Sequence, residues 1–357
     1  MQKTEKNARA AKAAAFIAAA ALVLAAGLAL AARYDLSLNL ALRPLWEAGQ
    51  AAHAAGQRSV WYTWGILAEC LGPLPAYAAA VLVGWGLCAE TRRTRRSRTG
   101  RLLAGVLLVL GGMLAAAASM AACLKRRQVL TLPPLLVWGV GLLAGAAVLA
   151  WALCSRISAA DLRRWRALSL LWAAMDVGQL AVVNLLKLLW QRTRFDDLLA
   201  AGDLSGFTHW LQAPGGGGSS FPSGHTASAG VLLVLVFACR LFDSCKGDEA
   251  GFLFVGYGFT GAVAFGRLLI GRHYLADTLA AIAIDSLLLA ALWFAPPVKR
   301  WLARVTAVSP GPGAVPPEKE NRLPPPPKKQ PWRRSAAVQG GQAQGENAAP
   351  KKKGEPS

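Results

Sequence analysis

The sequence predicts an all-α protein that crosses a membrane several times. Hydrophobic residues make up 54% of its 357 residues, and the mean hydropathy is +0.36. The segment from residue 299 onward is polar, so the apolar content is concentrated in the earlier part of the chain. There, long apolar runs alternate with short basic segments, which is the pattern of transmembrane helices and their loops. We therefore expect a polytopic transmembrane helix bundle with about eight spans.

Eight apolar runs account for the predicted spans. They cover residues 13–32, 65–89, 102–124, 130–154, 168–190, 223–241, 252–270 and 274–294. The first run ends on Ala-Leu-Ala-Ala, as a cleaved signal peptide would, but its length favours an uncleaved anchor. Between the first two runs, residues 33–62 have leucines at helical spacing, which indicates an interfacial helix, although part of the segment also alternates as a strand would.

The basic residues give the expected orientation. The net charge is +20 and the isoelectric point is near 10.4, values that in a soluble protein would suggest nucleic-acid binding. Here the cations gather in loops and in the C-terminal segment, so membrane topology explains them better and no nucleic-acid partner is expected. With the N-terminus inside, the basic segments at 92–101 and 163–166, the turn at Lys246 and the C-terminal segment all lie inside. Residues 125–127 are the one exception.

Three polar clusters stand at the edges of the apolar runs, in the second half of the chain. The first pairs Lys187 with Arg194, the second is Pro-Ser-Gly-His at 222–225, and the third spans Arg267 to Asp277. The orientation predicted from charge places all three outside, although hydropathy and charge counting made no use of them. Ionisable residues at such positions are costly and usually functional.

The chemistry of these residues suits phosphoryl transfer. Lys187 and Arg194 are two helical turns apart and share a face, and Arg267 adds a third cation. Ser223 and Gly224 lie where a helix should begin, which offers free N–H groups to an oxyanion. In addition, His273 and Asp277 are four residues apart, so the carboxylate can orient the imidazole, and His225 is left to act as an acid. No metal is needed by this set, and no carboxylate cluster that would bind one is evident.

The three clusters resemble the signature of the phosphatidic acid phosphatase type 2 and vanadium haloperoxidase superfamily. That signature is Lys-x6-Arg-Pro, then Pro-Ser-Gly-His, then Ser-Arg-x5-His-x3-Asp, and this chain follows its order and spacing over about residues 165–295. Two positions depart from it: Phe195 replaces the proline and Gly266 replaces the serine. These departures bear on substrate detail more than on chemistry.

The resemblance implies a role for each matched residue. His273 would attack phosphorus and form a phosphohistidine, with Asp277 orienting it and His225 protonating the leaving oxygen. The expected phosphate-binding residues are Lys187, Arg194, Ser223, Gly224 and Arg267. Composition and the resemblance together predict three parts of the chain: N-terminal transmembrane helices with basic cytoplasmic loops (1–164), a catalytic membrane domain with a six-helix phosphatase-like core (165–298), and a disordered, basic, Pro-rich cytoplasmic tail (299–357).

The expected function is hydrolysis of a lipid phosphate at the outer face of a membrane, without a cofactor, and the membrane expected is a bacterial inner membrane. The candidate lipids are undecaprenyl pyrophosphate, phosphatidylglycerol phosphate, phosphatidic acid and lipid A, and the sequence does not choose among them or give an oligomeric state. Three alternatives stay open: a lipid phosphotransferase using the same site, a vanadium haloperoxidase, which the membrane layout disfavours, and a non-catalytic lipid-binding or transport protein.

Overall fold

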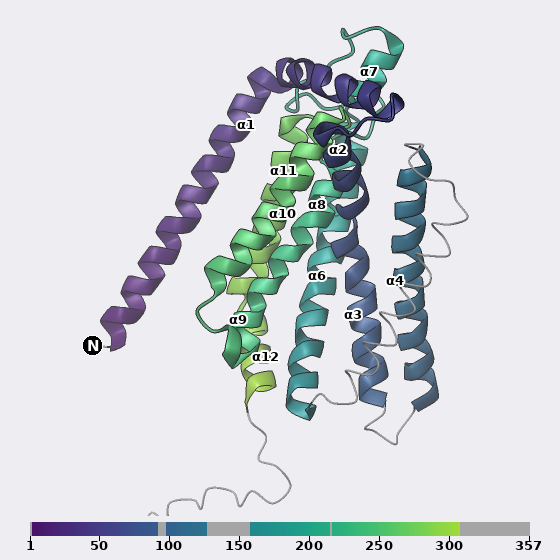
Figure 1. Ribbon diagram of the computed structural model, residues 1–357. Coiled ribbons are helices and arrows are strands. Elements are labelled where there is room, and N and C mark those ends of the chain that lie inside the picture. Colours follow the sequence, from purple (N-terminus) through teal and green to yellow (C-terminus); the bar gives the residue numbers. More distant parts are fainter. Residues whose placement is uncertain (1, 92–97, 127–157, 215, 308–357) are drawn as a thin grey trace, which may run out of the picture. The chain divides into compact units, whose positions relative to one another are not determined.

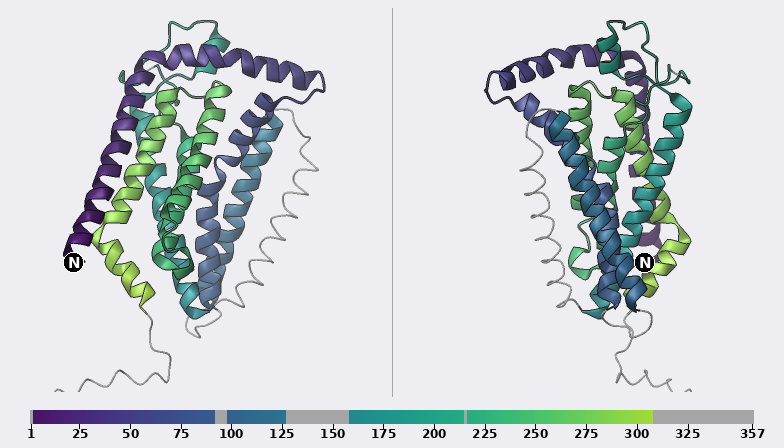
Figure 2. Two further views of the ribbon diagram at one scale, coloured as in Figure 1. Left: turned by 60° about the vertical axis from the view of Figure 1, so that its left-hand side comes forward. Right: turned by 90° about the vertical axis from the view of Figure 1, so that its right-hand side faces the viewer.

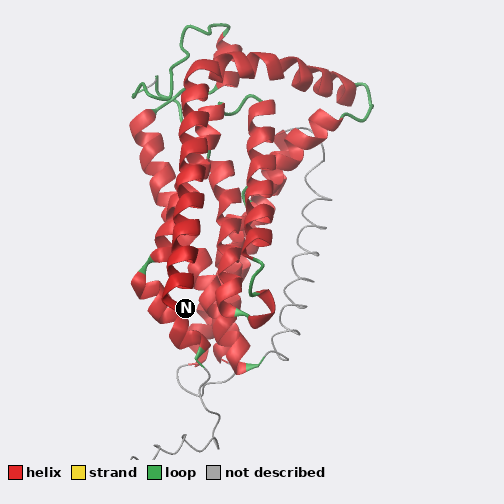
Figure 3. Ribbon diagram, turned by 90° about the vertical axis from the view of Figure 1, so that its left-hand side faces the viewer, coloured by secondary structure: helices red, strands yellow, loops and turns green. Residues whose placement is uncertain are grey.

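The computed structural model describes residues 2–91, 98–126, 158–214 and 216–307, and these residues form helices and loops with no strand (Figure 3). The helices are α1 (Gln2–Ala54), α2 (Val60–Leu71), α3 (Leu74–Thr91), α4 (Arg98–Arg126), α6 (Ala159–Trp190), α7 (Phe195–Ala201), α8 (Gly224–Gly230), η1 (Val231–Phe237), α9 (Ala238–Leu241), η2 (Asp243–Cys245), α10 (Glu249–Leu269), α11 (Leu275–Phe294) and α12 (Pro296–Thr306) (Figure 1). The described residues all fall in a compact unit of residues 1–308.

The predicted helical membrane bundle is confirmed. Among the described residues, seven helical stretches are long and apolar enough to cross a membrane, and they correspond to seven of the eight predicted runs. The remaining run, 130–154, lies outside the described residues. Two spans are less regular than their hydropathy suggests. The second is divided into α2 and α3 at Gly72-Pro73, where proline removes a backbone donor, and the sixth changes from α8 to the tighter helix η1 after Gly230.

Helix α1 runs alongside α11 and then turns across the end of the bundle where α7 lies (Figures 1 and 2). The segment 33–54 is therefore helical, and the alternative of a strand is wrong. The leucines at helical spacing, Leu38, Leu42 and Leu45, are half-buried, but the buried side of this helix is more polar than they suggested. Asp35 and Asn39 are buried together with Ala31 and Trp46, whereas Leu40 is exposed. A polar stripe of this kind is stable only if the bundle supplies partners for it.

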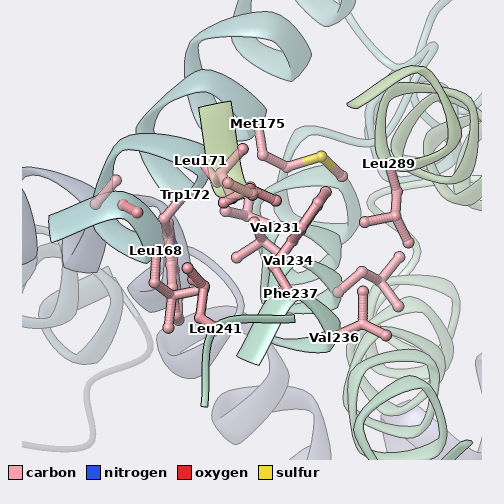
Figure 4. Close-up of a cluster of buried hydrophobic side chains, with 14 residues drawn as sticks. Leu168, Leu171, Trp172, Met175, Val231, Val234, Val236, Phe237, Leu241 and Leu289 are labelled. Atoms are coloured by element: carbon pink, nitrogen blue, oxygen red, sulfur yellow. The ribbon is translucent and has the colours of Figure 1, made fainter. Parts of the chain in front are cut away.

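The main packing core lies in the middle of the bundle, between α6, η1 and α11. Figure 4 shows its side chains interdigitating around Trp172 of α6 and Phe237 of η1. Because lipid tails are as apolar as these side chains, close van der Waals packing holds such helices together. This core holds α6, α8 and α11 in fixed positions relative to one another. The polar clusters lie at the ends of these helices.

Helix α12 changes the expected boundary of the catalytic part. Its residue Leu302 is buried in the main core, and Trp301 and Val305 pack against it. The boundary predicted at residue 298 thus falls inside a helix, because apolar residues recur every three or four positions and give α12 a face that can be buried. The rest of the predicted tail, from residue 308, lies outside the described residues.

Candidate active site

The end of α6 and the loop before α8 lie together at one end of the bundle. Lys187 Nζ donates a hydrogen bond to the Ser219 carbonyl oxygen at 2.6 Å, and the Arg194 guanidinium donates to Ser219 Oγ at 3.0 Å. Lys187 is also within electrostatic range of Arg194, Arg267 and Asp277. The three predicted cations therefore gather around one locus, as their order along the chain suggested.

The Pro-Ser-Gly-His segment begins α8, as predicted. Ser223 is the N-cap, and its Oγ accepts hydrogen bonds from Thr226 N at 3.4 Å and from Thr226 Oγ1 at 2.9 Å. The backbone N–H of Ser223 donates to the carbonyl of Asp277 at 2.9 Å, which ties α8 to α11. Gly224 faces Lys187, because a methyl group built on it would lie 3.9 Å from Lys187 Cε. The second cluster therefore adjoins both the first and the third.

His273 and Asp277 form a buried pair at the start of α11. The His273 Nδ1 atom lies 2.8 Å from the Ser220 carbonyl oxygen and 3.4 Å from Asp277 Oδ2. Since a carbonyl and a carboxylate only accept hydrogen bonds, Nδ1 carries the ring proton and Nε2 holds a lone pair. Asp277 is held in turn by hydrogen bonds from Ser220 Oγ and from Tyr274 N. These contacts fix the orientation and the tautomer of the His273 ring.

Burial keeps the His273 imidazole neutral. Removal from water lowers the pKa of His273 to about 3, well below its ordinary value of 6.5; the hydrogen bond with Asp277 opposes the shift, and the charge of Arg267 adds to it. A neutral imidazole is the form that can attack an electrophile. The lone pair on Nε2 is therefore available throughout the physiological pH range.

Arg192 is a part of the site that the sequence did not indicate. Its side chain is fully buried. One guanidinium nitrogen donates to Asp277 Oδ1 at 2.8 Å, another donates to Asp35 Oδ2 at 2.9 Å, and Nε donates to the Thr208 carbonyl at 2.9 Å. The guanidinium also lies 4.0 Å from the centroid of the Tyr274 ring. By contrast, Arg272 pairs with Asp196 at 2.7 Å near the surface.

Helix α1 reaches the same site through its polar stripe. Asp35 Oδ1 accepts a hydrogen bond from Ala276 N at 2.9 Å, and Asn39 Nδ2 donates to the carbonyl of His273 at 3.1 Å. Both residues are 1% exposed. Helix α1 therefore fixes the backbone on either side of the turn from His273 to α11.

The third cation, Arg267, is buried at the end of α10 beside Glu69 of α2, with 3.8 Å between the guanidinium and the carboxylate. The neighbouring Gly266 explains one departure from the family signature. A methyl group built there would lie 2.1 Å from Ala68 Cβ, so α2 and α10 approach too closely for serine.

The other departure from the family signature, Phe195, is the first residue of α7 and is fully buried against Tyr274. It takes the helix position that proline favours.

His225 lies in the first turn of α8, beside the break between α2 and α3, since a methyl group on Gly72 would lie 3.4 Å from His225 Cβ. An apolar groove of about 330 Å³ is lined by residues on both sides of this break. Its lining residues are Leu71, Leu74, Pro75, Ala78, Trp172, Leu232 and Phe259.

Within the described parts of the chain, no group of three or more His, Cys, Asp or Glu side chains is arranged to hold a metal ion.

The fold and the site together define a class: an integral membrane helical protein with an oriented imidazole and a cluster of cations at one end of its bundle. Comparison with known families gives the particular assignment. Residues 166–301 match the model of the PAP2 superfamily, and this matched segment contains all three polar clusters. No curated protein and no solved structure gives a significant match to the chain. The family and the apolar helices together fit a membrane phosphatase.

Proposed function

We propose that this protein is an integral membrane phosphatase that hydrolyses the phosphomonoester or pyrophosphate of a lipid through a phosphohistidine. The observation that carries the proposal is the state of His273. Its Nδ1 is engaged by Ser220 and Asp277, so its Nε2 lone pair is free to react beside Lys187, Arg194 and Arg267. Positive charges fixed in place before the reaction favour the transition state of phosphoryl transfer more than they favour bound substrate.

In the first half-reaction, His273 Nε2 attacks phosphorus, a phosphorus–nitrogen bond forms, and the bond to the leaving oxygen breaks. The imidazole becomes positively charged, and Asp277 stabilises that charge. His225 gives its proton to the leaving oxygen. In the second half-reaction, a water molecule passes a proton back to His225 and attacks phosphorus, which releases phosphate and neutral His273.

The remaining cluster residues hold the phosphoryl oxygens. Lys187, Arg194 and Arg267 supply charge, and Ser223 with the Gly224 amide supplies the start of α8. The hydroxyl of Ser223 already caps its own helix through Thr226. Its contribution to phosphate binding is therefore expected to be smaller than that of the three cations.

The apolar groove supports a lipid substrate. Its lining residues Leu71 and Leu74 flank the break that lies beside His225, and all of its lining residues are apolar, so it suits a hydrocarbon chain and offers nothing to a polar leaving group. A phosphate ester whose alcohol carries such a chain could place the phosphoryl group among the cations and the chain in the groove.

Charge distribution along α6 supports an outer-face site. Arg163, Arg164 and Arg166 lie at the start of this 32-residue helix and Lys187 lies near its end, so they are separated by most of its roughly 48 Å length. Lys246 and Arg300 lie in other segments predicted to be inside. Under the positive-inside rule, the end with the arginines faces the cytoplasm and the end with His273 faces out.

The test is phosphate release from a panel of lipids by the purified protein in detergent. The panel contains undecaprenyl pyrophosphate, phosphatidylglycerol phosphate, phosphatidic acid and lipid A, with an aryl phosphate as a soluble substrate. We expect release from at least one lipid and its loss in His273→Ala. Transfer of phosphate to a second lipid without release would instead identify a phosphotransferase, and no turnover of any substrate would contradict catalysis.

The two histidines should fail in different ways. A good leaving group needs little protonation, so the aryl phosphate should partly restore His225→Ala and leave His273→Ala inactive. General acid catalysis contributes about 10²- to 10⁴-fold, which is the size of the defect that the aryl substrate should reduce. Acid quenching should also trap an acid-labile phosphoenzyme in the parent and none in His273→Ala. Equal recovery of both variants would contradict the assigned roles.

A further inference from the structure

A continuous buried chain of charged groups leads from the imidazole to helix α1. It runs from His273 to Asp277 at 3.4 Å, from Asp277 to Arg192 at 2.8 Å, and from Arg192 to Asp35 at 2.9 Å. The side chains of Asp35, Arg192 and Asp277 are no more than 1% exposed. Each group is thus removed from water and depends on the next for its charge balance.

The balance of charges in this buried network determines how much negative charge Asp277 keeps. A lone ion pair with Arg192 would neutralise Asp277 and leave little negative charge for the imidazole. Asp35 changes this balance, because Arg192 then serves two carboxylates, and the three groups together keep one net negative charge. That charge lies next to His273, where a positive charge develops when the imidazole attacks an electrophile.

The geometry shows that Asp35 is also fixed, and not merely near. Its second oxygen accepts the N–H of Ala276, the residue before Asp277, and Asn39 one turn along α1 holds the carbonyl of His273. Arg192 is held in its plane by the ring of Tyr274 and by its bond to the Thr208 carbonyl. A guanidinium can bridge two carboxylates in this way, whereas an ammonium group lacks the fork geometry.

We propose that Asp35 and Arg192 are positioning residues for the histidine nucleophile, and that α1, which lies outside the family-matched segment, thereby completes the catalytic site. The proposal rests on the phosphatase function proposed above. Arg192 orients Asp277, and Asp35 offsets the charge of Arg192 so that Asp277 stabilises the phosphorylated imidazole. In this arrangement the N-terminal helix has a role in the chemistry in addition to any role in anchoring.

Charge-neutralising variants separate this role from a purely structural one. The net charge of Asp35, Arg192 and Asp277 is −1 in the parent, 0 in Asp35→Asn, −2 in Arg192→Gln, and −1 again in the double variant. Asp35→Asn keeps the shape of the side chain and the acceptor for Ala276 N. We expect kcat to fall about 10- to 100-fold, the usual effect of losing a group that orients a functional histidine. We expect KM to change less than about twofold, because no contact with substrate is lost.

The double variant gives the sharper test. If the charge balance matters, Asp35→Asn/Arg192→Gln should be more active than Arg192→Gln alone, because a second substitution restores the net charge of the parent. If the network only holds the fold together, the double variant should be less active and less stable than Arg192→Gln alone. Glu47→Gln is the matched control, since Glu47 is on the same helix, is exposed, and pairs only with Arg43 among the contacts in the described structure.

The substrate series locates the defect within the reaction. Because Asp35 acts on the nucleophile, an aryl phosphate should leave the Asp35→Asn defect unchanged while it partly restores His225→Ala. Full activity of Asp35→Asn, or recovery by the aryl substrate, would overturn the positioning role with the proposed function intact. A parent protein that hydrolyses no substrate would overturn both proposals, and that result is visible before any variant is made. Gel filtration and thermal unfolding of each variant in detergent show whether a loss of kcat reflects misfolding.

Discussion

Asp277 and Asp285 lie on the same helix, eight residues apart, and both are fully buried, but their surroundings are opposite. Asp277 receives hydrogen bonds from Arg192, Ser220 and the N–H of Tyr274. Neither oxygen of Asp285 has a hydrogen-bond partner in the described part of the chain. A buried carboxylate is stable only when other groups offset its loss of water. The layer at the end of α11, which holds the proposed catalytic residues, provides these groups, and the layer two turns deeper does not.

The deeper layer is built around packing instead. Asp285 lies against Gly230, at the point where α8 becomes η1, and a methyl group on that glycine would meet Asp285 Oδ2 at 2.0 Å. Asp176 of α6 is close enough for its charge to act on Asp285. The comparison therefore separates two ways in which a bundle accommodates an acidic residue: with a full set of donors, or with space left by a glycine.

The largest effect is expected when the two carboxylates are changed in the same way. Asp277→Asn loses the negative charge and keeps only one acceptor oxygen, so it can no longer hold both Arg192 and Nδ1 of His273, and kcat should fall by about 10³- to 10⁴-fold, as when the carboxylate is removed from a catalytic triad. Asp285→Asn loses no hydrogen bond or ion pair seen in the described residues, so kcat should stay within about twofold. Phosphate release by the two purified variants makes the measurement. A comparable loss in both would show that the deeper layer also serves catalysis.

Much of the fold follows from hydropathy, because apolar runs of sufficient length have few alternatives in a membrane. Local irregularities were less predictable. Pro73 marks the break between α2 and α3 in the sequence, but nothing in the run from 231 to 237 distinguishes a tighter helix from an ordinary one. Similarly, the leucine spacing in α1 did not indicate that Asp35 would be buried on the inward side of the helix, where it pairs with Arg192.

Some residues of the candidate site could likewise be predicted from the sequence and others could not. Residues at short, fixed spacings could be predicted, and the structure gathers Lys187, Arg194 and Arg267 near His273. Contacts across long separations could not, since Asp35 and Arg192 are 157 positions apart and share no local pattern. One available signal was position: Ser219 and Ser220 immediately precede the Phe-Pro-Ser-Gly-His segment. Another was the presence of Asp35 at the edge of an apolar run, where a charge calls for a partner.

The second prediction tests whether the deeper layer depends on space. Gly230→Ala places a methyl group against Asp285, and overpacking of this kind typically destabilises a protein by about 1 to 3 kcal/mol. Gly178→Ala is the matched control, because its methyl group would lie 3.4 Å from Leu288 Cδ2, an ordinary contact, and alanine is the better helix former. Thermal unfolding in detergent should show a lower midpoint for Gly230→Ala alone.

Removal of the obstructing carboxylate should reverse this loss. The double variant Gly230→Ala/Asp285→Ala gives the new methyl group room, so its unfolding midpoint should return toward that of Asp285→Ala. Equal destabilisation by Gly230→Ala in the presence and absence of Asp285 would mean that some other contact limits the space at this position.

A third prediction concerns what the deeper layer contacts. Leu232 lies two residues after Gly230 and lines the apolar groove. Leu232→Trp should fill part of the groove and lower kcat/KM for a long-chain lipid phosphate about tenfold, as loss of a chain contact worth roughly 1 to 3 kcal/mol would. Hydrolysis of an aryl phosphate should be unaffected. Leu287→Trp, on an exposed face of α11, is the control. Equal loss for both substrates in Leu232→Trp would remove the groove from the substrate site.

The smallest expected effect concerns His273, in the layer at the end of α11, and is seen in the pH dependence of stability. The pKa of His273 is about 3 in the folded protein, against an ordinary value of 6.5 that the unfolded chain should approach. Between these pH values the unfolded state binds a proton at His273 that the folded state does not bind. The free energy of unfolding should therefore be highest above about pH 6.5 and should fall as the pH is lowered toward 3.

A difference of one unit between the folded-state and unfolded-state pKa of a group corresponds to about 1.4 kcal/mol of stability. Lowering the pH from about 6.5 to about 5.5 should therefore cost the parent about 1 kcal/mol through this residue. His273→Gln lacks the titrating group. The parent should thus lose more of its unfolding midpoint over this range than the variant does, and parallel losses would show that His273 is not held neutral by burial.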